Sequence, residues 1–293
     1  MFVYSSIRLL FGSIIIIFDM IIINNCPPPR WTQNDSLIGV NPGLGMKPGM
    51  SEERVDSSLY LLAAASEDFV PTNEKGEGDK NADFAVRLKS FYDKYNVSSG
   101  TSLVDCGAEP NEVRPLDKAN CQFDIEEALG ECGEWPFGYV VDRMNTNYAQ
   151  PCIILKLNKI FNWEPKPVRV ENLDKKEYKL MDQKLKNRIR KSQDKNFVWI
   201  DCRGRYPADR EVIDLEYFPS NQGMPIKYFP YRGGEYQQPI VAVKAKIRRD
   251  STGMPKVNKL VHVECRAWYD NVKHSTKDMS GLIRFEVMLE GKS

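Results

Sequence analysis

The stretch VHVECRAW, residues 261–268, decides the fold class of this 293-residue chain. Apolar and polar side chains alternate along it, and Val261, Val263 and Cys265 share one side. The other side carries His262, Glu264 and Arg266. Because successive strand residues point to opposite faces, the alternation predicts a β-strand with one face in a core and the other in solvent.

The same period of two recurs in the C-terminal third, in residues 198–202, 241–247 and 283–289. Half-buried strands separated by turns are typical of an antiparallel β-sandwich, so a mainly-β domain is expected. Cys202 and Cys265 both fall on the inward faces of their strands. They are therefore natural partners for a bridge within the core.

Short helices are expected between the strands. Residues 84–95 have helical spacing, and one face carries Phe84, Leu88, Phe91 and Tyr92. Asp124 is a favourable first residue for a second helix over 124–129. The carboxylates of Asp124, Glu126 and Glu127 are accordingly interpreted as a helix start, not as a glycosidase pair.

Three further segments are interpreted from their composition. Residues 172–193 are highly charged, and their apolar stripe consists of Leu180, Leu185 and Ile189. This pattern indicates a solvated helix on a sheet edge and disfavours a nucleic-acid-binding arm. Residues 39–50, GVNPGLGMKPGM, are rich in glycine and proline, which argues against a helix or strand there. Residues 71–82 are expected to form an exposed loop.

Composition excludes several classes of function. Lys and Arg total 41 against 40 Asp and Glu, so charge gives no general attraction to nucleic acid, and no nucleic-acid partner is expected. Seven cysteines without a CxxC pair, and only two histidines, make a metal site improbable and favour disulfides in an oxidising compartment. The sequence has no P-loop, HExxH or GxSxG motif, so no catalytic residue, cofactor or enzyme activity is expected.

Residues 2–23, FVYSSIRLLFGSIIIIFDMIII, form an apolar segment about long enough to cross a ~30 Å hydrocarbon core. Arg8 and Asp19 interrupt it, but its Ile, Leu and Phe residues favour insertion, and Asp19 lies near one end. A cleaved signal peptide with residues 9–18 as its apolar core is the alternative. No small-x-small cleavage site follows, which favours a signal anchor.

The cysteines decide the expected orientation, because the large C-terminal part must face an oxidising compartment. The expected type II layout is a cytoplasmic tail at 1–7, a transmembrane anchor at 8–24, an extended juxtamembrane segment at 25–50 and an extracellular domain at 51–293. Two N-x-[ST] sequons occur. Asn96 is the better candidate for glycosylation, and Asn34 is weaker because it lies close to the membrane.

Several motifs resemble the β subunits of Na,K-ATPase and H,K-ATPase. Arg30-Trp31 followed by DSLIGVNPGLGMKP is similar to the family's juxtamembrane segment, and PCIILKLNKIFNWEPKP (151–167) to its strand with the fourth ectodomain cysteine. The other similar motifs are FGYV (137–140), Tyr228-Phe229-Pro230-Tyr231 with QPIVAVKAKI after it, VECRAW (263–268), and FVWIDCRG with PADRE, which resembles arthropod, nervana-like members. The resemblance covers residues 30–293.

This resemblance implies one transmembrane helix, an immunoglobulin-like sandwich, and the disulfides Cys106–Cys121, Cys132–Cys152 and Cys202–Cys265. It also implies a plasma-membrane protein without catalysis that escorts a P-type ATPase α subunit and tunes its sodium and potassium affinity. The family contact with α would fall on residues 7–23 and on Arg30, Trp31, Tyr228, Phe229, Pro230 and Tyr231. Membrane lipid and a small single-pass regulatory subunit are further expected partners.

Two alternatives stay open. Tyr228, Phe229 and Tyr231 are also consistent with core packing at a sheet edge, which is the favoured interpretation for Trp163 and Trp199. The isoleucine-rich anchor with Asp19 and the very short tail depart from the family pattern. A pump-independent adhesion or junctional protein with the same ectodomain is therefore the second hypothesis.

Overall fold

A computed structural model describes residues 41–49, 58–61, 69–73, 78–96, 103–104, 106, 120–141 and 148–291. The expected anchor at 8–24, Arg30, Trp31 and Asn34 lie outside these ranges. Within them, no helix combines the length and the apolar character needed to span a bilayer.

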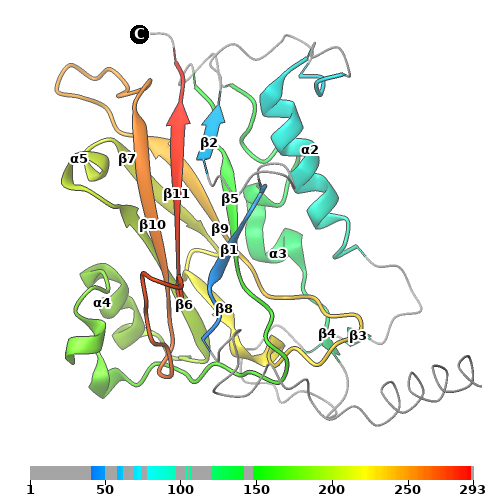
Figure 1. Cartoon of the computed structure of the whole chain (residues 1–293), viewed down its shortest axis with the longest axis vertical. Coiled ribbons are helices and arrows are strands. Elements are labelled where there is room, and N and C mark those ends of the chain that lie inside the picture. The colour runs from blue at the N-terminus through cyan, green and yellow to red at the C-terminus, as the bar shows by residue number, and fades with distance from the viewer. Residues whose placement is uncertain are drawn as a thin grey trace, which may run out of the picture.

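Two β-sheets form the body of the molecule (Figure 1). The five-stranded sheet has the order β2 (Ser58–Leu61), β11 (Leu282–Leu289), β10 (Leu260–Trp268), β6 (Phe197–Gly204) and β8 (Gly223–Pro225). The four-stranded sheet has the order β1 (Leu44–Lys47), β5 (Cys152–Leu157), β9 (Val241–Ile247) and β7 (Ile213–Phe218). Neighbouring strands described in these sheets run antiparallel, except for the parallel pair β2 and β11. The mainly-β prediction is confirmed.

Short elements surround the sheets. A small parallel pair joins β3 (Leu103–Val104) to β4 (Asn120–Cys121). The α-helices are α2 (Lys80–Tyr92), α3 (Ile125–Leu129), α4 (Gln183–Lys191) and α5 (Pro207–Arg210). The 3₁₀ turns are η2 (Gly130–Cys132), η3 (Val170–Asn172), η4 (Lys176–Tyr178) and η5 (Ile226–Tyr228). Helices α2 and α4 lie on opposite sides of the sheets (Figure 1).

Both sheets contribute to one apolar core. Val241, Val243, Ala245 and Ile247 are buried there on β9, as the alternation predicts. The same cluster includes Val263 and Phe285 from the other sheet. A polar contact also joins the sheets: the Tyr217 hydroxyl on β7 donates to the Cys202 carbonyl at 3.1 Å and accepts from the Cys202 amide at 2.8 Å.

Glu264 and Arg266 on the outer face of β10 are buried, which contradicts their predicted solvent exposure, whereas His262 on the same face is partly exposed. A second apolar cluster covers this side of the sheet and includes Trp199 and Trp268, paired across β6 and β10. Phe197 on β6 also belongs to that cluster, and residues between 168 and 189 supply the remainder. The alternation was correctly interpreted as a strand, but the outer face of that strand is covered by residues 168–189, which lie far from it in sequence. Trp199 packs in a core, as expected.

The charged segment forms this cover, so its prediction was only partly right. Leu185 and Ile189 on α4 are buried against the second cluster. The N-cap of α4 is Asp182, so Leu180 lies before the helix and outside its apolar stripe. Leu180 is 48% exposed. Since Leu185 packs in one cluster with Trp199 and Trp268, the helix lies on the sheet face and not at its edge.

Two predictions from glycine and polar composition were wrong. Residues 44–47 form strand β1, which pairs in antiparallel register with Leu157 to Ile154 of β5. Tertiary pairing at a sheet edge thus overrides the local signal. Helix α2 begins at Lys80 inside the expected loop, because the Asp79 carboxylate caps it by accepting from the Asn81 amide. Helix α3 begins after Asp124, as predicted.

Three disulfides form among the described cysteines, in the three pairs that the resemblance implies. Cys132–Cys152 joins η2 to the start of β5, and the backbone around Gly138 supports it. A Cβ at Gly138 would lie 2.0 Å from the Gln150 carbonyl oxygen, and its φ is +76°. Only glycine fits this close approach, which gives a physical reason for the FGYV motif.

Candidate partner-contact surface

The Tyr228–Tyr231 segment follows β8 through the turn η5, at the end of the five-stranded sheet. The Ile226 amide donates to the Asn196 carbonyl at 2.8 Å, and the Phe229 amide to the Ile226 carbonyl at 2.9 Å. These backbone bonds fix where the segment leaves the sheet, so its four side chains have defined and different environments.

Phe229 and Pro230 are buried. The Phe229 ring lies 6.0 Å from Trp163, which packs edge-on at 5.2 Å against Tyr269. Trp163 is partly buried against the main core, consistent with the expected core packing. For these two residues the segment serves as an anchor to the core.

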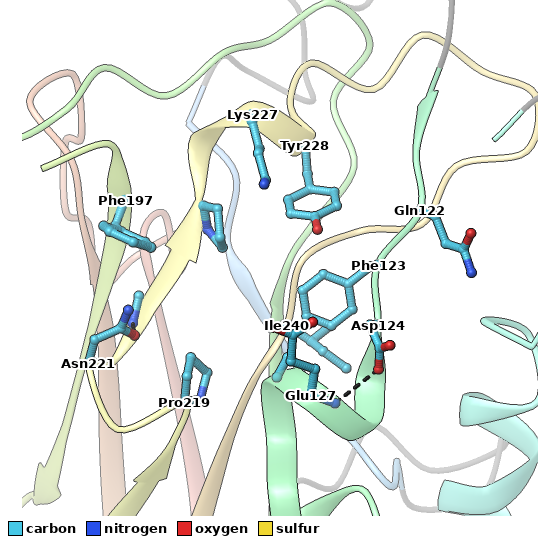
Figure 2. A pocket seen from close by; sticks show the side chains of 13 residues that line it. Gln122, Phe123, Asp124, Glu127, Phe197, Pro219, Asn221, Lys227, Tyr228 and Ile240 are labelled. Atoms are coloured by element: carbon cyan, nitrogen blue, oxygen red, sulfur yellow. Dashed lines mark hydrogen bonds between the residues drawn. The ribbon is translucent and has the colours of Figure 1, made fainter. Parts of the chain in front are cut away.

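Tyr228 is half-buried beside a groove of about 420 Å³ (Figure 2). Its ring meets Phe123 edge-on at 5.3 Å, and the Lys227 ammonium lies 5.7 Å from the same ring. Figure 2 shows Phe123 and Tyr228 together at one end of the groove, with Asp124 and Glu127 at the start of α3. The groove is therefore bordered by both aromatic and charged side chains.

Tyr231 is half-buried beside a second aromatic ring and a cation. It forms an isolated parallel bridge with Phe161, and its ring is 5.1 Å from Tyr236. The Lys159 ammonium lies 5.1 Å from the Tyr231 ring and 5.3 Å from the Tyr236 ring. Burial, reinforced by nearby Lys94, lowers the pKa of Lys159. Cation–π attraction between an ammonium group and an aromatic ring is stronger when the ammonium group is partly desolvated, as that of Lys159 is.

Two buried glutamines position the chain that returns from Tyr231 to β9. Gln237 accepts from the Phe123 amide at 2.7 Å and donates to the Tyr95 carbonyl at 2.6 Å. The Tyr95 hydroxyl donates to the Gln238 carbonyl at 2.9 Å. The end of α2, the start of α3 and the aromatic segment are therefore held as one unit.

The polar groups around this surface have structural partners. The Asp124 carboxylate caps α3 by accepting from the Glu127 amide at 2.9 Å, which confirms the helix-start interpretation. Beside Trp268 of the second apolar cluster, the His274 ring lies 4.5 Å from the Trp268 ring, and burial lowers the pKa of His274 to about 4. In the described part of the chain, no group of three or more His, Cys, Asp or Glu residues could hold a metal ion.

The sequence did not reveal the surroundings of the segment. Lys159 and Phe123 join it only through the fold: the Phe161–Tyr231 bridge brings residues 70 positions apart together, and Phe123 contacts the Tyr228 ring. Tyr236 lies only five residues after Tyr231, but nothing in the sequence showed that its ring packs against that of Tyr231.

Comparison with known proteins assigns the family. The family model described as sodium / potassium ATPase beta chain matches residues 1–285. The chain belongs to this family. It is 33% identical over 270 residues to sodium/potassium-transporting ATPase subunit beta-1 of Drosophila melanogaster, covering 89% of this chain and 75% of the relative. Identity to the Drosophila subunit beta-2 is 30% over 269 residues, with the same two coverages. A probable subunit beta-3 of Caenorhabditis briggsae is 27% identical over 271 residues, covering 90% and 71%.

The β chain is the non-catalytic subunit of the pump, so this family member is not an enzyme. The resemblance inferred from the cysteines and aromatic motifs is thereby confirmed. The family match includes the N-terminal residues, where the sequence departs most from the expected pattern.

Proposed function

We propose that this chain is the β subunit of a sodium/potassium-transporting P-type ATPase, supporting folding and membrane delivery of the α subunit and tuning its ion affinity. The observation that carries the proposal is the family match over residues 1–285, together with the three disulfides of the folded domain. The protein resides in the plasma membrane with its C-terminal domain outside the cell.

The proposed layout has a cytoplasmic tail at 1–7, a signal anchor at 8–24 and an extended connection at 25–50. Strand β1 already belongs to the folded unit at the end of that connection. Residues 51–293 complete an extracellular domain that we assign to the immunoglobulin-like sandwiches, because two mainly antiparallel sheets share one core. Lipid surrounds the anchor, and a small single-pass regulatory subunit is a further partner.

The proposed contact with α uses the aromatic segment unequally. Phe229 and Pro230 hold it to the core, whereas the half-buried Tyr228 and Tyr231 reach the partner. Arg30 and Trp31 extend the contact toward the membrane. Tyrosine suits this role because it combines a large apolar area with a polar tip.

The proposed support of α has a simple thermodynamic basis. A ligand that binds only the folded form of a protein shifts its folding equilibrium toward that form. A rigid domain tied by three disulfides loses little conformational entropy when it binds, so more of the contact energy is available to stabilise α.

Co-purification of the α subunit with the full-length chain from detergent-solubilised membranes tests the proposal. Wild-type protein should recover α, and Tyr231→Ala should recover at least threefold less. Tyr206→Ala is the matched control, because Tyr206 is 46% exposed at the N-cap of α5, away from the aromatic segment. Surface expression without any recovered α would refute the proposal and support the pump-independent adhesion hypothesis.

A further inference from the structure

Helix α4 is strongly basic and its charges are not explained by the contact with α. The sequence QKLKNRIRK holds five Lys and Arg residues and no acidic residue. Leu185 and Ile189 fix the helix to the sheet, while positions 184, 188 and 191 share a face by helical spacing. This basic face, defined by Lys184, Arg188 and Lys191, is exposed.

The basic face borders a hollow of about 370 Å³, separate from the groove beside Tyr228. Cations from four places in the chain line this hollow: Lys184 and Arg188 on α4, Arg203 on β6, Arg210 on α5, and Arg248 after β9. Helices α4 and α5 lie on the same side of the molecule, opposite α2 (Figure 1). The fold thus gathers five cationic side chains around one concavity.

The carboxylates in the hollow have other partners. Asp214 binds Arg248, with 2.6 Å between Nη2 and Oδ1. Asp182 caps α4, and Asp201 is buried and accepts from the Asp182 amide at 3.0 Å. These three are the acidic residues among those that line the hollow.

The remaining guanidinium groups donate to neutral atoms. Arg188 donates to the Ser220 carbonyl at 2.8 Å and to the Gln222 side-chain oxygen. Arg203 donates to the Leu180 carbonyl at 3.3 Å, and Arg210 to the Gly204 carbonyl at 2.9 Å. Their positive charge is therefore not neutralised by a contacting carboxylate, and they keep donors for an anion.

We propose that this hollow and the basic face of α4 bind a sulfated glycan chain of the glycosaminoglycan class. The inference rests on the extracellular placement proposed above, because that compartment offers anionic saccharides and excludes nucleic acid. Sulfate and carboxylate groups match the planar donors of arginine, and a chain can lie along Lys184, Arg188 and Lys191 into the hollow.

The shape of the site favours a saccharide over an anionic membrane. A flat bilayer cannot enter a concavity that is enclosed by cations from four places in the chain. Peripheral membrane sites also insert apolar side chains beside their cations, whereas the exposed positions of α4 itself are polar or charged. Binding to vesicles is therefore treated as a competing outcome.

The test uses the full chain in detergent and immobilised heparin as the probe, at about 0.15 M salt. Lys184→Gln, Lys191→Gln and Arg203→Gln are combined in one variant; these side chains border the site, and they leave the Arg188 contacts intact. We expect its dissociation constant for heparin to rise at least tenfold, with a weaker dependence on salt. The matched control combines Lys80→Gln, Arg87→Gln and Lys89→Gln on α2, which removes the same charge on the opposite side and should change heparin affinity less than twofold.

Several outcomes would overturn the inference. These are no binding by wild type, equal losses in the two variants, or undiminished binding to fully desulfated heparin. Binding to phosphatidylserine vesicles but not to heparin would assign the surface to membranes instead. Equal melting temperatures of the two triple variants separate lost charge from misfolding. Recovery of α is measured on the same samples, so failure here is distinguishable from failure of the pump assignment.

Discussion

The buried charge cluster on β10 gives the sharpest stability prediction. One oxygen of Glu264 accepts from Arg266 at 2.7 and 2.9 Å, and the other accepts from Arg284 at 2.9 Å. The Glu264 and Arg266 side chains are only 7% and 10% exposed, and Arg284 is 29% exposed. Glu264→Gln removes the anion and leaves two cations, one of them buried.

The expected cost follows from that burial. Removing one partner of a buried ion pair costs about 3–5 kcal/mol, and the partial exposure of Arg284 places this case near 3 kcal/mol. For a domain of about 240 residues, this lowers the melting temperature by roughly 6–12 °C. Thermal unfolding of the full chain in detergent, followed by tryptophan fluorescence, measures the shift.

Two comparisons isolate the role of burial. Asp214→Asn removes the same kind of charge from the Asp214–Arg248 pair, whose side chains are 59% and 47% exposed. It should cost less than about 1 kcal/mol. Glu264→Met with Arg266→Met removes both buried charges and should be less harmful than Glu264→Gln alone. Similar shifts for Glu264→Gln and Asp214→Asn would refute the argument.

The same cluster sets a pH dependence. Burial raises the pKa of Glu264, but hydrogen bonds from Arg266 and Arg284 outweigh it, so the pKa lies below its ordinary 4.5. A lowered carboxylate pKa contributes stability that is present above the unfolded-state pKa and lost as pH falls through the folded-state value. Acid destabilisation below about pH 4.5 should therefore be reduced in Glu264→Gln.

Three further predictions test other parts of the structure. Asn96 is exposed after α2, so Asn96→Gln should abolish a glycosidase-sensitive mobility shift if this sequon carries a glycan, and an unchanged shift would exclude it. Replacing Cys202 and Cys265 by serine removes a disulfide between residues 63 positions apart and should lower the free energy of unfolding by about 4.3 kcal/mol. The same change at Cys106 and Cys121, 15 positions apart, should lower it by about 3.0 kcal/mol, and denaturant titration should give this order. Burial lowers the pKa of His274 to about 4, so folded protein should lose stability as pH falls from about 6.5 to 4, and His274→Gln should flatten that slope in pH-dependent melting.

The strands were predictable because period two is a local property. Residues 241–247 alternate in sequence and in burial, with Lys244 and Lys246 on the outer side of β9. The same kind of alternation was misleading on β10, because residues 168–191 cover its charged face. No local pattern in VHVECRAW distinguishes a charge in water from a charge under a second cluster of side chains. Strand β1 was missed for the same reason, since pairing with β5 is a long-range contact.

The contact surface shows a similar division. The motif Tyr228-Phe229-Pro230-Tyr231 could be identified from the sequence by resemblance, but the residue types alone do not determine which of its rings are buried. That depends on Trp163 beside Phe229 and on Tyr236 beside Tyr231, two contacts that the loops after β5 and η5 create.

The proposed glycan site and the groove beside Tyr228 share one structural element. The loop between β7 and β8 supplies Pro219 and Asn221 to the groove, while Gln222 lines the hollow. Arg188 holds this loop through the Ser220 carbonyl and the Gln222 side chain. An anion that draws Arg188 away from those atoms would release the loop wall of the groove. Bound heparin would then change the affinity for α. Because coupling between two binding sites is reciprocal, bound α would change the affinity for heparin by the same factor. Equal heparin affinity of free and α-bound protein would show that the loop keeps its position when the hollow is filled.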